Sequence, residues 1–199
     1  MGLEFHGIDP ETNEEGSPTV WVDVDRRRLV FQGDTVTGAE SAVHLEMRDQ
    51  YSVTDEADQF AAWKAGHRYS MDDRAEWWHP FHDFVVETIA RGVTIRRARI
   101  VSEPVTEYIR YEHSHTFTNI AAGEQIRWLP RSRTLDLALP GADFWLFDSR
   151  IVRFNLFTGD GEWADLRNVM TEEPATVELC AKAFEAVWER AVPHGDFKV

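Results

Sequence analysis

The sequence predicts an α/β or α+β fold, in which helices flank a mixed β-sheet and an N-terminal β-hairpin precedes them. Helical patterns with start and stop signals bracket a long stretch of short β-branched and aromatic runs, which Pro, Gly and Asp turns separate. Helices that bracket a mixed set of strands form a layered domain. We expect an N-terminal tail and hairpin region over residues 1–50 and a main mixed α/β domain over residues 51–199.

The first element is the hairpin. Residues 18–34, PTVWVDVDRRRLVFQGD, contain two β-branched and aromatic runs around a polar turn. Strand side chains alternate, so Val20, Val22 and Val24 share one face. A free edge of this hairpin would accept a partner strand, and the alternative is that the hairpin packs on the main domain. Residues 33–51 carry only a weak pattern.

Two helices are predicted before the strand-rich stretch. The first covers residues 54–66, with Thr54 as its N-cap and Gly66 as its end. The second starts near His79, because Pro80 suits the first turn of a helix and no later position.

The strand-rich stretch opens with a strand at residues 93–101, VTIRRARIV, followed by a helix in PVTEYIRYEH, residues 104–113. Four more strands are EQIRWLP (124–130), DFWLF (143–147), RIVRFNLF (150–157) and GEWADLRNV (161–169). The Gly-rich FTGDGEW is then a turn between two strands. A final helix covers residues 174–191, and its buried stripe consists of Val177, Cys180, Phe184, Val187, Trp188 and Ala191.

Composition limits the function classes. Among 199 residues, 35 are acidic and 21 basic, which gives a formal net charge of -14 and disfavours direct binding to nucleic acid. The one cysteine, Cys180, lies in a helical apolar stripe and is expected to be a small buried hydrophobe. The chain shows neither a signal-peptide pattern nor an apolar run long enough to span a bilayer, so we expect a cytoplasmic protein without membrane contact.

Histidines and carboxylates are the first candidates for chemistry. The pairs His79–His82 and His113–His115 lack the third and fourth ligand that zinc needs, so we expect no metal and no cofactor. The glutamates at positions 103, 107 and 112 are expected to form a solvated face, and Glu103 with the second histidine pair is the one combination suited to an enzyme.

Arginines are the second candidates. The run DRRR at residues 25–28 is expected in a hairpin turn, and IRRARI at residues 95–100 on the solvated flank of a strand. In WLPRSR, Trp128 and Arg131 lie at a strand end, where an arginine could hold an anionic group of a partner.

The order of elements from Arg74 to Ala191 resembles one half of a phospholipase D-like domain. In that family the strand before a hairpin carries the motif HxKxxxxD, and here Gly141, Asp143 and Asp148 fall on its three positions. The resemblance implies a phospholipase D-like half domain without its nucleophile. An aspartate in place of lysine would also repel a phosphate.

The whole chain from Pro18 to His194 is also similar to an uncharacterised actinobacterial family. The shared stretches are PTVWVD, LVFQG, HLEMRDQY, YIRYEH, NIAAGEQIRWLPR, DFWLFD and WERAVPH. Members of that family are encoded beside helix-turn-helix regulators. The resemblance implies a regulatory accessory and supplies no catalytic residue.

Three functions are therefore carried forward. The preferred one is a non-catalytic interaction protein that binds a helix-turn-helix regulator, with a homodimer as the other association considered. The second is a small-molecule sensor with an aromatic cleft, and the third is an enzyme of unrecognised type using His113, His115 and Glu103. The candidate ligand- or partner-binding residues are Trp128, Arg131, Tyr111, Trp145 and Asp148.

Overall fold

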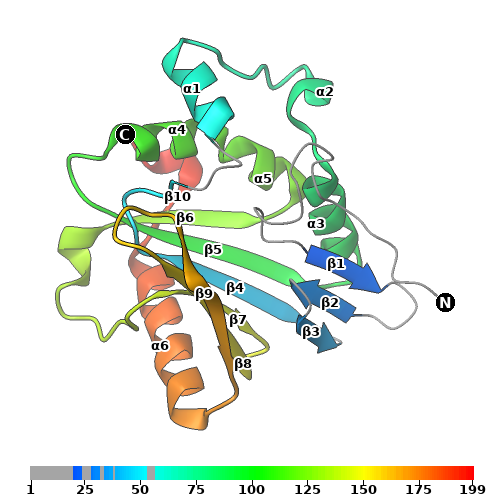
Figure 1. The fold of residues 1–199 in the computed structure, drawn as a ribbon, viewed down its shortest axis with the longest axis vertical. Helices are drawn as coiled ribbons and strands as arrows, with labels where there is room; N and C mark the ends of the chain where they lie inside the picture. Colours follow the sequence, from blue (N-terminus) through cyan, green and yellow to red (C-terminus); the bar gives the residue numbers. More distant parts are fainter. Residues whose placement is uncertain (1–19, 24–27, 32–33, 38, 53–56) are drawn as a thin grey trace.

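A seven-stranded mixed sheet flanked by helices forms the centre of the molecule (Figure 1). The computed structural model describes residues 20–23, 28–31, 34–37, 39–52 and 57–199. The strand order is β10-β6-β5-β4-β7-β8-β9. The strands are β4 (Ser41–Glu46), β5 (Thr94–Val101), β6 (Gln125–Pro130), β7 (Asp143–Phe147), β8 (Ile151–Phe157), β9 (Trp163–Thr171) and β10 (Val192–Pro193). This arrangement confirms the predicted α/β class.

The central strand β4 is the element that the hydrophobic pattern does not predict. It pairs in parallel with β5 and antiparallel with β7, and β5 pairs in parallel with β6. All but the first of its residues are buried, so SAVHLE shows no alternation of apolar and polar positions. The middle of the main sheet therefore comes from the range 1–50, which the sequence pattern assigns to the N-terminal region.

A separate three-stranded antiparallel sheet precedes β4. It consists of β1 (Val20–Asp23), β2 (Arg28–Phe31) and β3 (Asp34–Thr37), in that order. Residues 24–27, which would form the turn of the predicted hairpin, lie outside the described residues. The hairpin as such stays a prediction.

Six α-helices and two 3₁₀ turns are described: α1 (Ala57–Lys64), α2 (Arg74–Trp77), α3 (Pro80–Ala90), α4 (Glu107–His115), α5 (Phe117–Ala122), α6 (Pro174–Arg190), η3 (Arg131–Thr134) and η4 (His194–Asp196). Helix α3 begins where Pro80 predicts, and the pair His79–His82 serves as its cap: the His79 backbone N–H donates to His82 Nδ1 at 2.9 Å. Helix α1 is shorter than its prediction, and Thr54 lies outside the described residues.

The two faces of the sheet are covered by different helices. Helix α6 covers one face, where the predicted stripe packs on alternate residues of β4, β5, β7 and β8. Cys180 is fully buried there, as predicted, and burial raises the pKa of its thiol to about 11. On the opposite face, α3 packs at one end of the sheet and α4 at the other. None of the described helices combines the length and the apolar character needed to cross a bilayer.

The turn between β8 and β9 is hydrogen-bonded to the loop that follows β4. The predicted turn is present, with the Thr158 N–H donating to the Glu162 carbonyl at 2.8 Å. Ser52 donates through its backbone N–H to the Gly161 carbonyl at 3.1 Å and through its hydroxyl to the Asp160 carbonyl at 2.8 Å. Gly161 has a φ of +91°, and a Cβ at this position would lie 3.1 Å from the Gln50 carbonyl oxygen.

We predict that Gly161→Ala lowers the free energy of unfolding by about 1–3 kcal/mol, because it combines a left-handed backbone with a contact against rigid backbone. Gly159→Ala is the matched control. It lies in the same turn, has nothing within 4 Å of its added Cβ, and should change stability by less than about 0.5 kcal/mol. Urea denaturation measures both, and equal effects would refute the close contact of turn and loop.

Candidate functional site: a buried network of charged side chains

Neighbouring arginines of β5 point to opposite faces of the sheet. Arg96 lies on the α6 face, where its Nη2 is 2.6 Å from Glu185 Oε1. Arg97 and Arg99 lie on the other face, and each side chain is only 11% exposed. The expectation of a solvated flank for IRRARI is therefore wrong for these two arginines. The reason is that three other segments supply carboxylates to them.

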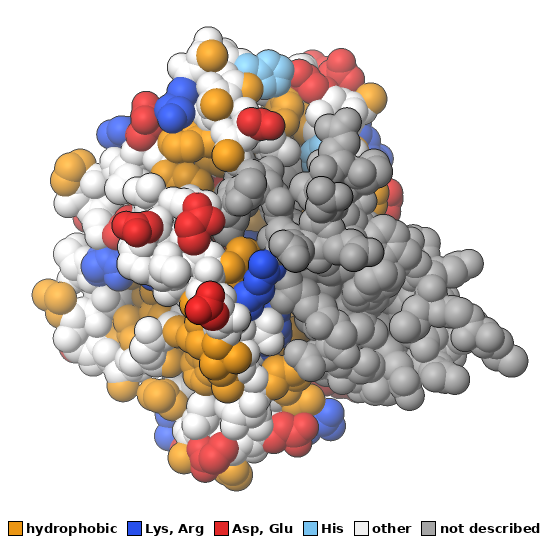
Figure 2. All heavy atoms as spheres, in the orientation of Figure 1, with side chains coloured by type: hydrophobic (Ala, Val, Ile, Leu, Met, Phe, Trp, Pro, Cys, Tyr) orange, Lys and Arg blue, Asp and Glu red, His pale blue; other side chains and the backbone are white. Residues whose placement is uncertain are grey.

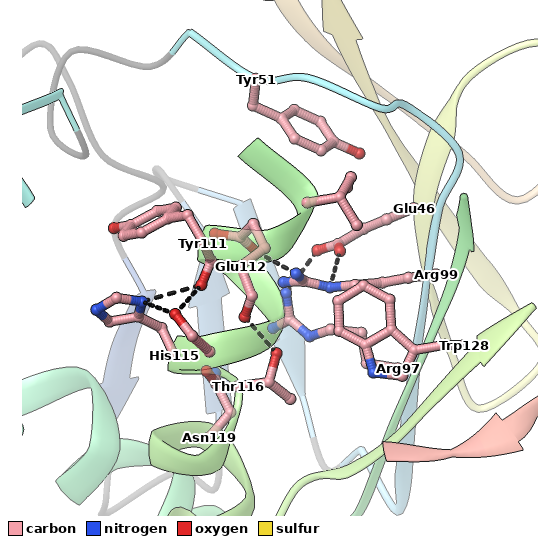
Figure 3. Close-up of polar contacts among 12 residues, drawn as sticks. Glu46, Tyr51, Arg97, Arg99, Tyr111, Glu112, His115, Thr116, Asn119 and Trp128 are labelled. Carbon is pink, nitrogen blue, oxygen red and sulfur yellow. Dashed lines mark hydrogen bonds and ion pairs between the residues drawn. The ribbon is translucent and has the colours of Figure 1, made fainter. Parts of the chain in front are cut away.

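Glu46, at the end of β4, lies between the two arginines. Its Oε1 is 2.6 Å from Arg97 Nη1 and its Oε2 is 2.5 Å from Arg99 Nε. Arg97 also pairs with Glu124, its Nε lying 3.0 Å from Oε2. Arg99 pairs with Glu112 of α4, as Figure 3 shows. The Glu112 side chain is 15% exposed, so it does not belong to the solvated face expected of the three glutamates.

Three members of this network, Glu46, Arg97 and Arg99, are held in their ionised forms. Burial alone would raise the pKa of Glu46, but Arg99 and then Arg97 outweigh it and hold the pKa at about 2. Burial likewise opposes the charge on each arginine, yet Glu124 and Glu46 raise the pKa of Arg97, and Glu112 and Glu46 raise that of Arg99. Glu46, Arg97 and Arg99 therefore do not exchange a proton near neutral pH. Their arrangement can bind elements together, but it does not supply a general acid or base.

Asp143 of β7 is a buried carboxyl group whose pKa is shifted toward neutrality. Its Oδ1 accepts from the Met47 N–H at 2.7 Å, and its Oδ2 accepts from the Tyr51 hydroxyl at 2.5 Å. Burial raises the pKa of Asp143 to about 6; the Tyr51 hydrogen bond opposes this shift and nearby Glu46 adds to it. The carboxyl group holds the loop after β4 against the sheet.

His44 precedes Glu46 by two residues on β4, so the two side chains lie on the same face of the sheet. Its ring stacks on Trp145, with centroids 4.2 Å apart, and its Nδ1 lies 3.3 Å from Glu46 Oε1. Burial lowers the pKa of His44 to about 3; Glu46 opposes the shift, and Arg97 and Arg99 add to it. The imidazole is therefore neutral at physiological pH. Of the candidate binding residues, Trp145 is thus packed beside the charged network.

The other two aromatic candidates are core residues. Trp128 is fully buried and stacks on Phe197, with centroids 5.7 Å apart, and its Nε1 donates to His194 Nδ1 at 3.2 Å. Tyr111 is buried in the same cluster, whereas Trp145 packs against the cluster under α3. The three aromatic side chains therefore do not line a common cleft.

The polar candidates hold strand ends in place. Arg131 donates through Nη2 to the Met47 carbonyl at 2.6 Å and through Nε to the Ser102 hydroxyl at 3.0 Å, so it joins the segments after β4 and β5. Asp148 lies in the turn between β7 and β8 with a φ of +52°. Its Oδ1 accepts from the backbone N–H groups of Glu40 and Ser41, both at 2.8 Å, at the start of β4.

The residues considered for an enzyme are dispersed. His113 contacts the His194 ring at a centroid distance of 4.4 Å, whereas His115 lies against Tyr111 at the same distance. Glu103 is exposed in the loop after β5. In the part of the chain that the structure describes, no group of three His, Cys, Asp or Glu side chains is placed to hold a metal ion.

An open polar pocket of about 480 Å³ lies between the loop after β4 and the turn between β8 and β9. It is adjacent to the carboxyl end of β4, an edge at which open α/β sheets commonly bind ligands. Its lining contains none of the predicted binding residues. The lining residues are Met47, Arg48, Asp49, Gln50, Ser52, Gly159 and Asp160.

Comparison with known proteins gives a family without an assigned activity. The model of a domain of unknown function (DUF6879) matches residues 31–199, which includes every strand of the seven-stranded sheet. No curated protein matches the chain.

We predict that Glu46→Gln lowers the free energy of unfolding by about 3–5 kcal/mol, because it leaves two buried arginines short of a carboxylate. Glu185→Gln is the matched control, since it removes the partner of Arg96 on the other side of the same strand, where the Glu185 side chain is 53% exposed. Glu185→Gln should lower the free energy of unfolding by less than about 1 kcal/mol. Urea denaturation measures the free energy of unfolding of both variants. Similar losses of unfolding free energy would contradict the burial of the network.

We predict that Asp143 makes the protein less stable as pH rises. The fold raises the pKa of this carboxyl group from 3.8 to about 6, so the neutral form is favoured, and the stability it gives below pH 4 is lost as pH rises through 6. The full loss corresponds to about 3 kcal/mol.

The variant Asp143→Asn keeps an acceptor for the Met47 N–H and cannot ionise. The free energy of unfolding of wild type minus that of the variant should therefore fall between pH 4.5 and 7.5 by about 2 kcal/mol. Taking the difference removes the contributions of histidines shared by both proteins. A difference that is constant with pH would show that Asp143 is not held as described.

Proposed function

Because the chain belongs to the DUF6879 family, for which no activity is assigned, we propose its function from the site: it is a non-catalytic interaction protein, an accessory to a helix-turn-helix transcription regulator. The observation that carries this proposal is the mutual ion pairing of Glu46, Arg97, Arg99, Glu112 and Glu124. The charged groups on this face of the sheet are engaged in holding β4 and α4, which favours a scaffold over a reactive centre.

The phospholipase D-like resemblance supports the same proposal. At the position of the nucleophilic histidine, Gly141 has no side chain to offer. At the position of the phosphate-binding lysine, Asp143 is 3% exposed and is occupied by Tyr51 and the Met47 N–H. A half domain of this type would keep the layered architecture and lack phosphodiesterase chemistry.

Charge supports the choice of partner. A protein with a formal net charge of -14 is repelled by DNA and attracted by the basic surface of a DNA-binding protein. The resemblance to a family encoded beside helix-turn-helix regulators provides a partner of that kind. Binding to the basic surface would compete with the operator DNA of the regulator.

We predict that the purified protein binds the helix-turn-helix regulator encoded beside its gene and does not bind duplex DNA by itself. Titration calorimetry at two salt concentrations should give a weaker affinity at the higher one, because attraction between opposite surface charges is screened. A gel shift with operator DNA should show the regulator leaving DNA as the protein is added. Gel retardation by the protein alone, or no heat of binding to the regulator, would contradict the proposal.

A small-molecule sensor is the second candidate, and one observation favours it. The polar pocket beside residues 47–52 is large enough for a small polar ligand. Its chemistry differs from the aromatic cleft expected from Trp128, Trp145 and Tyr111. Binding of the regulator in the absence of any small molecule would favour the interaction function over the sensor.

A further inference from the structure

Strand β9 forms an outer edge of the main sheet, and its residues are unusually accessible. Among the described strands it pairs only with β8. None of its nine residues is buried. Edge strands of soluble proteins are normally protected by lysine, proline or a covering segment, because an open edge invites association.

The middle of β9 bulges away from β8. Asn155 pairs with Asn168 and Phe157 with Trp163, so residues 164–167 lie opposite the single residue Leu156. Leu166, within this bulge, is 62% exposed, and Val169 beyond it is 39% exposed. Figure 2 shows hydrophobic side chains at the surface over β9, in the region where Figure 1 draws the strand. The bulge thus presents a leucine where edges usually present a charge.

Two charges flank this leucine symmetrically. Asp165 precedes Leu166 and Arg167 follows it, and neither forms an ion pair with another described residue. Two copies of a protein with a net charge of -14 repel each other over most of their surfaces. The segment around Leu166 is locally neutral, and its reversed copy is complementary to it in charge.

We infer that residues 163–169 of β9 form the interface between two copies of this chain, which meet antiparallel about a two-fold axis at Leu166. In this arrangement the two Leu166 side chains pack on each other. Asp165 of each copy faces Arg167 of the other, and Trp163 faces Val169. A two-fold interface is self-complementary in this way, since each contact occurs twice. The inference is independent of the proposed regulator.

The experiment is sedimentation velocity of the full chain over a range of protein concentrations. Wild type should show a monomer–dimer equilibrium, and Leu166→Asp should be monomeric throughout. Leu135→Asp is the matched control, because it adds the same charge at a leucine that is 87% exposed and outside β9. It should dimerise as wild type does. Circular dichroism melting checks that each variant is folded, as is expected for exposed positions.

Charge reversal tests the antiparallel register. Asp165→Arg alone and Arg167→Asp alone each place like charges opposite each other twice, so each should weaken the dimer by about tenfold. The double reversal, Asp165→Arg with Arg167→Asp, restores the complementarity and should return the dimer constant to nearly that of wild type. The inference is overturned if wild type stays monomeric, if the dimer survives Leu166→Asp, or if the double reversal remains as weak as the single ones.

Discussion

Two arginines buried on one strand constrain how the rest of the structure assembles. A guanidinium taken out of water without a carboxylate costs several kcal/mol, and Arg97 and Arg99 are supplied from three places: the end of β4, helix α4 and the residue before β6. Burial of the two arginines therefore requires all three segments to be in place. The network joins the parallel strands to the helix above them, where apolar packing alone would leave the position of that helix less defined.

The same arginines fix the register of β5. Side chains alternate along a strand, so a shift by one residue would turn both arginines onto the face that α6 covers with apolar side chains. The residues that the structure describes form no carboxylate network on that face; Glu185, the partner of Arg96, is half exposed at its margin. The apolar clusters under α3 and α4 then lie on either side of the polar centre, which divides this layer into three zones of distinct chemistry.

Much of the fold follows from the sequence, because periodicity and caps act locally. Helices α3 and α6 and strands β5 to β9 were predictable from such signals. Strand β4 was not, since burial of both its faces removes the alternation that marks a strand. The burial of Arg97 was not predictable either, because its partner Glu46 lies 51 positions earlier in the chain and composition alone suggests a solvated arginine. The charged network depends on tertiary contacts between distant segments, whereas most of the helices and strands that carry it follow from local sequence signals.

The turn at Asp148 has a consequence for how the chain acquires its structure. Backbone N–H groups of Glu40 and Ser41, at the start of β4, donate to the Asp148 carboxylate 108 and 107 positions further along. The central strand β4 therefore cannot be completed until the β7–β8 turn has been synthesised. A large loop must also close first. Folding dominated by such distant contacts is slow and leaves β4 exposed meanwhile. By the time Asp148 has been synthesised, the nascent chain already contains helices α1 to α5, while its central strand is still incomplete.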